Sequence, residues 1–156
     1  MSRLSFRVSV SADLPMLQQI RRAAFAPSFA GFREAVSEPV AAREFSDADR
    51  LQAEYLREVC DSDCPTRLVV VEAEGQVIGF CGYRVDPQRG RGEIDRNAIA
   101  PSRQGRGYGT QMYRYVIDRM REAGAVHVKV SPGGDTAHAG ARAAYRKASF
   151  EKSIPS

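Results

Sequence analysis

The sequence contains no tryptophan, two histidines and three cysteines. Cys60, Cys64 and Cys81 are odd in number, and the CDSDC pair lacks the second Cys or His pair that a zinc site needs. We therefore expect reduced thiols and no metal site. The longest strongly apolar run, residues 68–71, is far too short to span a bilayer, and the first ten residues lack the apolar stretch of a signal peptide. These absences predict a cytoplasmic protein with no membrane partner.

Composition predicts one folded domain over residues 1–156. With 43% apolar and 27% charged residues, the chain can bury a core of its own without disulfides. The net charge of +4 favours anionic partners, which are nucleic acid, anionic lipid or a phosphorylated cofactor. Arginines crowd into residues 84–106, which indicates one anion-facing region, although solvated turns would explain them as well.

The first half of the chain predicts one strand and two helices. Residues 4–10 alternate apolar and polar side chains, and residues 11–24 carry apolar side chains at helical spacing after a capping serine. Residues 26–45 contain glycine and proline and predict at most short helical pieces. Ser46 then begins a second helix, which Pro65 prevents from continuing far.

The second half predicts a mixed sheet. Strands are expected at residues 67–73, 76–85, 92–100 and 125–130, and helices at residues 107–124 and 137–148. Glu74 and Gly75 are typical of a tight hairpin between the first two of these strands. The third strand, the helix and the fourth strand form a βαβ unit, in which the two strands run parallel. The expected fold class is α/β, with helices on both faces of a mixed sheet.

A glycine-rich turn, RQGRGYGT at residues 103–110, precedes the helix of this unit. The first amides of a helix have no intrahelical partner, and the helix dipole adds roughly half a positive charge there. Gly105, Gly107 and Gly109 carry no side chain that would keep a bulky anion from the main chain. The turn therefore fits a pyrophosphate, and a tight turn without a ligand is the alternative.

Two other phosphate-binding motifs fit this turn poorly. A nucleoside triphosphatase loop needs a lysine before the Ser or Thr, but Thr110 directly follows Gly109. A dinucleotide fold needs an acidic residue at the end of the next strand, which here ends in Val130 and Ser131.

The stretch GEIDRNAIAPSRQGRGYG, residues 92–109, resembles the fourth strand and coenzyme A loop of the GNAT superfamily of N-acetyltransferases. The signature Q/R-x-x-G-x-G/A is met by Gln104, Gly107 and Gly109, and AGARAAYRKASF downstream resembles a late helix of the family. The resemblance covers residues 4–150 and implies a GNAT-like fold with acetyl-CoA as co-substrate. It implies cofactor contacts from Gln104, Gly105, Arg106, Gly107, Tyr108, Gly109 and Thr110.

The resemblance also implies a catalytic set. Glu93 is similar in position to the family's general base, and Asp95 shares its strand face, although a solvated or salt-bridged carboxylate is the alternative for both. Tyr145 matches the tyrosine that protonates the departing thiolate, or is a core aromatic. His138 stands where the family often has an asparagine that bonds coenzyme A. Backbone groups that bind the pantetheine arm in the family correspond to Ala98, Ile99 and Ala100.

The C-terminal end, FEKSIPS, departs from the family, which usually continues through two strands. We expect a shortened strand pair, whose open edge could be covered by a partner chain in a homodimer. The leading functional hypothesis is transfer of an acetyl group from acetyl-CoA to a primary amine, by direct attack in a ternary complex. The alternatives are a non-catalytic acyl-CoA-binding regulatory module and, without any recognisable motif, a nucleic-acid-binding protein. The sequence identifies neither the amine nor the acyl chain length.

Overall fold

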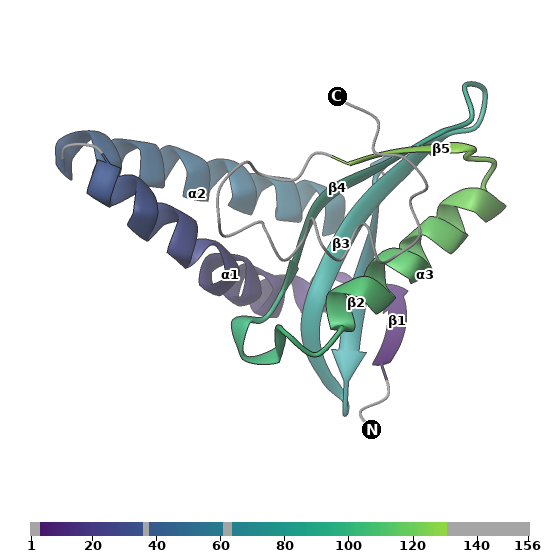
Figure 1. Ribbon diagram of the computed structural model, residues 1–156, viewed down its shortest axis with the longest axis horizontal. Helices are drawn as coiled ribbons and strands as arrows, with labels where there is room; N and C mark the ends of the chain where they lie inside the picture. Colours follow the sequence, from purple (N-terminus) through teal and green to yellow (C-terminus); the bar gives the residue numbers. More distant parts are fainter. Residues whose placement is uncertain (1–3, 36–37, 61–63, 131–156) are drawn as a thin grey trace.

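The computed structural model describes residues 4–35, 38–60 and 64–130 (Figure 1). The elements are β1 (Leu4–Val8), a 3-10 turn (Ser11–Asp13), α1 (Leu14–Ala35), α2 (Glu38–Cys60), β2 (Arg67–Ala73), β3 (Gln76–Asp86), β4 (Arg91–Ile99), a second 3-10 turn (Pro101–Arg103), α3 (Tyr108–Glu122) and β5 (His127–Val130). The helix expected at residues 137–148, with His138 and Tyr145, and the C-terminal segment lie outside the described residues.

The five strands form one mixed sheet in the order β1-β2-β3-β4-β5. Every neighbouring pair of strands is antiparallel except β4 and β5. These two strands run parallel, and α3 connects them in the sequence. This is the βαβ unit that the sequence predicts. Glu74 and Gly75 have φ values of 54° and 78°, which suit a two-residue hairpin because its twist matches that of the strands.

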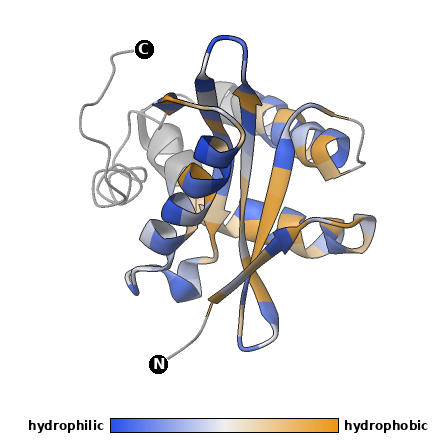
Figure 2. Ribbon diagram, turned by 90° about the vertical axis from the view of Figure 1, so that its right-hand side faces the viewer, coloured by the Kyte–Doolittle hydropathy of each residue, from blue (hydrophilic) through white to orange (hydrophobic). Residues whose placement is uncertain are grey.

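Alternate side chains of the strands enter two separate cores, one on each face of the sheet. Val69 and Val71 of β2 pack under α3, whereas Leu68 and Val70 of the same strand pack under α1 and α2. Figure 1 shows α3 on one side of the sheet and the α1–α2 pair on the other, and Figure 2 shows hydrophobic residues concentrated along the strands. The predicted fold class, with helices on both faces, is therefore confirmed.

The prediction of short helical pieces at residues 26–45 is wrong. α1 runs through Pro27 to Ala35, and α2 begins at Glu38, so that Ser46 lies inside α2 rather than at its start. Contacts between the two helices explain the difference, because a proline or glycine weakens a helix locally and tertiary packing can outweigh that cost. The buried guanidinium of Arg21 pairs with Asp49 at 2.8 Å and joins the two helices.

An ion-pair network joins β1 to the 3-10 turn that precedes α1 and to the neighbouring strand β2. Arg7 donates hydrogen bonds of 2.8 and 2.7 Å to the Asp13 carboxylate, and it also pairs with Glu72 of β2. The Asp13 carboxylate accepts a further 2.8 Å bond from the Val10 amide. The bonds from Arg7 hold the pKa of Asp13 below its usual range, although burial opposes this effect.

Asp13→Asn is expected to lower the free energy of unfolding by roughly 2 kcal/mol at neutral pH, since a buried, charge-assisted hydrogen bond is lost. A lowered pKa in the folded state stabilises the fold above the pKa of an unfolded aspartate, about 3.9, and this contribution is lost as the pH falls from there through the lowered pKa of the folded protein. The difference between the two proteins in urea unfolding should therefore shrink as the pH falls below about 4. Asp118→Asn, which changes an exposed aspartate on α3, is the control and should cost little at any pH. A pH-independent difference would contradict the assignment.

Among the described residues, the helices lack the combination of length and apolar character that a membrane span requires.

Candidate active site

The glycine-rich turn lies between the end of β4 and the start of α3. Gly105 and Gly107 have φ values of 80° and 81°, a conformation that side-chain-bearing residues rarely adopt. Among the described residues other than its two chain neighbours, no atom lies within 4 Å of the position that a Cβ would occupy on either glycine. The Gln104 side chain donates a 2.9 Å hydrogen bond to the Ile99 carbonyl, which ties the turn to the end of the strand.

The backbone amides of this turn are available to a ligand. Among the described residues, no backbone carbonyl accepts a hydrogen bond from the amides of residues 105–110, and the first helical bond runs from Gln111 to Gly107 at 3.2 Å. The turn thus presents a row of donors at a helix N-terminus, where the dipole favours negative charge.

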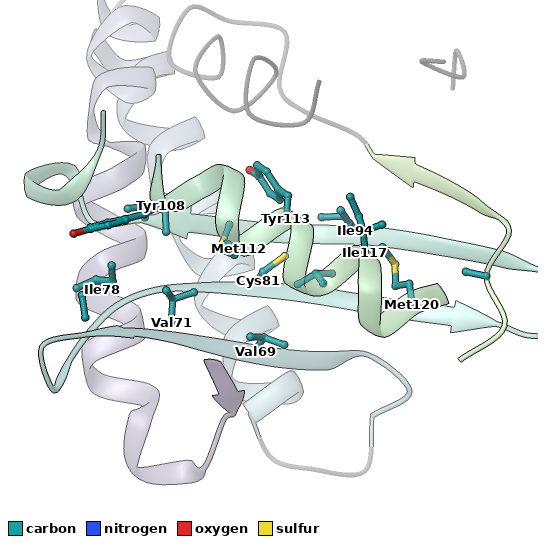
Figure 3. Close-up of a cluster of buried hydrophobic side chains, with 14 residues drawn as sticks. Val69, Val71, Ile78, Cys81, Ile94, Tyr108, Met112, Tyr113, Ile117 and Met120 are labelled. Carbon is teal, nitrogen blue, oxygen red and sulfur yellow. The ribbon is translucent and has the colours of Figure 1, made fainter. Parts of the chain in front are cut away.

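The side chains of the turn differ in what they can offer. The Tyr108 ring is buried in the core under α3, near Ile78, so only the backbone of this residue faces the turn (Figure 3). Arg106 is exposed and can add a positive charge beside the amides. The other residues of the turn are also expected to contact the cofactor. Gln104, Gly105 and Gly107 are exposed, and Gly109 and Thr110 are half-buried.

The end of β4 follows the part of the strand that pairs with β5. The described pairing with β5 stops at Ile94, which faces Val130, so residues 95–99 have no partner on that side among the described residues. The buried side chains of Ala98 and Ile99 pack on opposite faces of the sheet. Ala100 donates a 2.7 Å hydrogen bond back to β3, at the Ile78 carbonyl.

The two carboxylates of β4 both face α1 and α2. Glu93 accepts hydrogen bonds of 3.3 and 3.0 Å from Arg84 of β3, in a pair that is partly exposed. Asp95 lies beside the Tyr55 hydroxyl of α2, whose pKa is raised by burial and then by the Asp95 charge. The structure thus places the Glu93 and Asp95 carboxylates on the same face of β4, near the end of the strand that leads into the glycine-rich turn.

Three further polar side chains, at Tyr55, Asn97 and Tyr113, meet around β4, and the sequence does not predict that they meet. Tyr55 and Tyr113 occupy positions on the apolar faces of their helices, and Asn97 is one polar residue within a strand. Tyr113 donates a 2.6 Å hydrogen bond to Asn97, whose side chain donates a 3.0 Å bond to the Asp95 carbonyl. Only the register of β3 and β4 and the docking of the helices bring these groups together.

The cysteines take no part in this region as ligands or disulfides. All three are free, and burial raises the pKa of the Cys81 thiol well above its usual range. Within the described ranges, no three or more His, Cys, Asp or Glu residues are grouped closely enough to hold a metal ion.

Comparisons with known proteins agree with this fold. Streptothricin acetyltransferase from Streptomyces lavendulae is 31% identical over 96 residues, which cover 62% of this chain and 50% of that protein, so the chain spans about half the length of this curated relative. The coenzyme A complex of PaiA N-acetyltransferase from Thermoplasma acidophilum has a TM-score of 0.70 at 15% identity, over 96% of this chain and 90% of that one. A GNAT family acetyltransferase from Brucella melitensis, in complex with acetyl-CoA, has a TM-score of 0.58 at 21% identity, over 85% and 78%.

A model of the acetyltransferase (GNAT) family also matches residues 29–150, a range that contains α2, the sheet from β2 onward and the glycine-rich turn. Because that model covers most of the sequence, the chain belongs to the acetyltransferase (GNAT) family.

Proposed function

We propose that the protein transfers an acetyl group from acetyl-CoA to a primary amine, by direct attack in a ternary complex. The observation that carries this proposal is the row of amides at residues 105–110, which donate to no carbonyl of the described residues, together with the open space that the described residues leave at the Cβ positions of Gly105 and Gly107. Such a turn suits the pyrophosphate of coenzyme A, because the amides and the helix dipole both favour an anion and no side chain blocks its approach.

The position of the end of β4, next to the glycine-rich turn, supports the proposed placement of the pantetheine arm. Backbone groups around Ala98, Ile99 and Ala100 are proposed to bind that arm along residues 95–99, where β4 has no described partner on its β5 side. The arm would then run from the glycine-rich turn along β4, and the thioester would lie near the carboxylates of the same strand.

The reaction requires removal of one proton from nitrogen, because a protonated amine cannot attack a thioester. Glu93 is the proposed general base, and Asp95 is the second carboxylate on the same face. Tyr145 is proposed to protonate the thiolate that leaves, and His138 to contact coenzyme A.

A non-catalytic acyl-CoA-binding module is the second candidate function. The observation in its favour is the Arg84–Glu93 ion pair, since a carboxylate held by a guanidinium can serve the sheet alone.

Turnover separates the two functions. We expect the purified protein to release free thiol from acetyl-CoA in the presence of some members of an amine panel, which includes streptothricin because of the relative of that name. Binding is measured in parallel by thermal shift with acetyl-CoA, longer acyl-CoAs and NAD. A ligand at 100 times its Kd stabilises the folded state by about 2.7 kcal/mol. Stabilisation without thiol release on any amine would favour the binding module, and no response to any CoA ester would overturn both functions.

A further inference from the structure

A β-bulge interrupts the pairing of β3 and β4. Ile94 and Asn97 each pair with a residue of β3, but Asp95 and Arg96 between them share the single residue Gly82. A bulge bends its strand and redirects the side chains that it carries. This bulge comes directly after Ile94, the last residue of β4 with a described partner on β5. It therefore influences where the Asp95 carboxylate points.

Side chains hold the bulge from both faces of the sheet. From the α3 side, Tyr113 bonds Asn97, and Asn97 in turn bonds the Asp95 carbonyl. From the α2 side, Tyr55 places its hydroxyl against Gly82, where a Cβ would come within 2.1 Å of the oxygen. A glycine at position 82 thus leaves the space that this hydroxyl occupies.

The Tyr55 hydroxyl is costly to the fold. It is buried and, in the part of the chain that the structure describes, makes no hydrogen bond of normal length. Phenylalanine would fill the same space without burying a polar atom, so we expect the hydroxyl to lower the stability of the fold. Groups that cost stability in this way are typical of functional sites.

The chemistry around the hydroxyl identifies its partner. Asp95 is the acidic group whose charge acts on it, and Arg96 lies with its guanidinium carbon 5.5 Å from the centre of the Tyr55 ring. By strand alternation, the other charged residues of β3 and β4 on this face are Arg84 and Glu93, which pair with each other, and Asp86 and Arg91, which face each other at the far end of the two strands. In unliganded enzymes, hydrogen bonds of the catalytic set are often long and shorten only when the substrate binds. A hydroxyl beside a carboxylate, without a close partner, fits this description.

We propose that Tyr55 is a positioning residue for the acyl transfer, which holds the Asp95 carboxylate toward the ammonium group of the acceptor. The inference rests on the proposed function and deepens it. The hydroxyl donates a hydrogen bond to the carboxylate when the amine is bound, and the bulge keeps both groups on the α1–α2 face. Tyr55 itself transfers no proton.

A double-mutant cycle tests this role. Tyr55→Phe is expected to lower kcat/KM for the best amine of the panel about tenfold, the scale of one hydrogen bond to a charged group. The KM for acetyl-CoA and the Tm should not change for the worse, because the glycine-rich turn is unaltered and the lost hydroxyl makes no hydrogen bond of normal length with the described residues. In an Asp95→Asn background, the same substitution should cause no further loss. Tyr83→Phe is the matched control, a half-buried tyrosine under α3 that should leave all values unchanged.

A second variant displaces the Tyr55 hydroxyl without changing Tyr55 itself. Gly82→Ala places a methyl group where the Tyr55 oxygen lies, and it should reproduce the loss in kcat/KM. Additive losses in the cycle, unchanged kcat/KM in Tyr55→Phe, or a fall in Tm that accounts for the lost activity would overturn the inference alone. A wild-type protein that binds acetyl-CoA but acetylates no amine would overturn the proposed function and the inference with it.

Discussion

Glu93→Gln is expected to lower kcat by about 10²- to 10⁴-fold at neutral pH, the range that a general base contributes. The side chain lies on β4 upstream of the glycine-rich turn, and its carboxylate faces the α1–α2 side of the sheet. Glutamine keeps the shape and can still accept a hydrogen bond from Arg84, but it cannot take a proton from the acceptor. Steady-state thiol release with saturating acetyl-CoA measures the effect.

The pH dependence separates a lost base from a disturbed site. At high pH, a growing fraction of the amine is already deprotonated, so the deficit of Glu93→Gln should shrink as the pH approaches the pKa of the amine. Glu122→Gln is the matched control, because it also removes a carboxylate paired with an arginine, at 2.7 Å from Arg119 on the surface of α3. A deficit that is the same at every pH would show that Glu93 supports structure or binding instead.

The strands were easier to predict than the helices for a physical reason. β2 and β3 are rich in β-branched and aromatic residues, and their hairpin carries a glycine at a position with positive φ. These are local signals. The length of α1 and α2 depends on contacts between the helices, such as the pair of Arg21 and Asp49, which no local pattern contains.

The same distinction applies to the candidate site. The glycine-rich turn can be predicted from sequence because its amides, its glycines and the start of the helix are contiguous along the chain. The bulge at Asp95 cannot be predicted in this way, because it depends on how β4 pairs with β3 at Gly82. It also depends on Tyr55 and Tyr113, which come from different helices. A contiguous candidate for a phosphate-binding turn can therefore be proposed from sequence, whereas the orientation of the side chains on β4 cannot.

Gly107→Ala is expected to raise the Kd for acetyl-CoA by about 10- to 100-fold, or roughly 1.4 to 2.7 kcal/mol. Gly107 is the N-cap of α3 at φ 81°, and no described atom lies where the new methyl group would stand. The methyl group therefore meets no clash within the protein, but it enters the space through which the pyrophosphate would approach the amides. Isothermal titration with acetyl-CoA measures the change.

Backbone strain alone could also weaken binding, and the chain provides a control for it. Gly75 in the β2–β3 hairpin has a φ of 78° and the same open surroundings, so Gly75→Ala carries a similar left-handed strain of about 1–2 kcal/mol away from the turn. Both variants should lose similar thermal stability, while only Gly107→Ala should lose affinity. Equal affinity in the two variants would mean that the α3 entrance does not hold the pyrophosphate, and the amides of residues 105–110 would need another ligand.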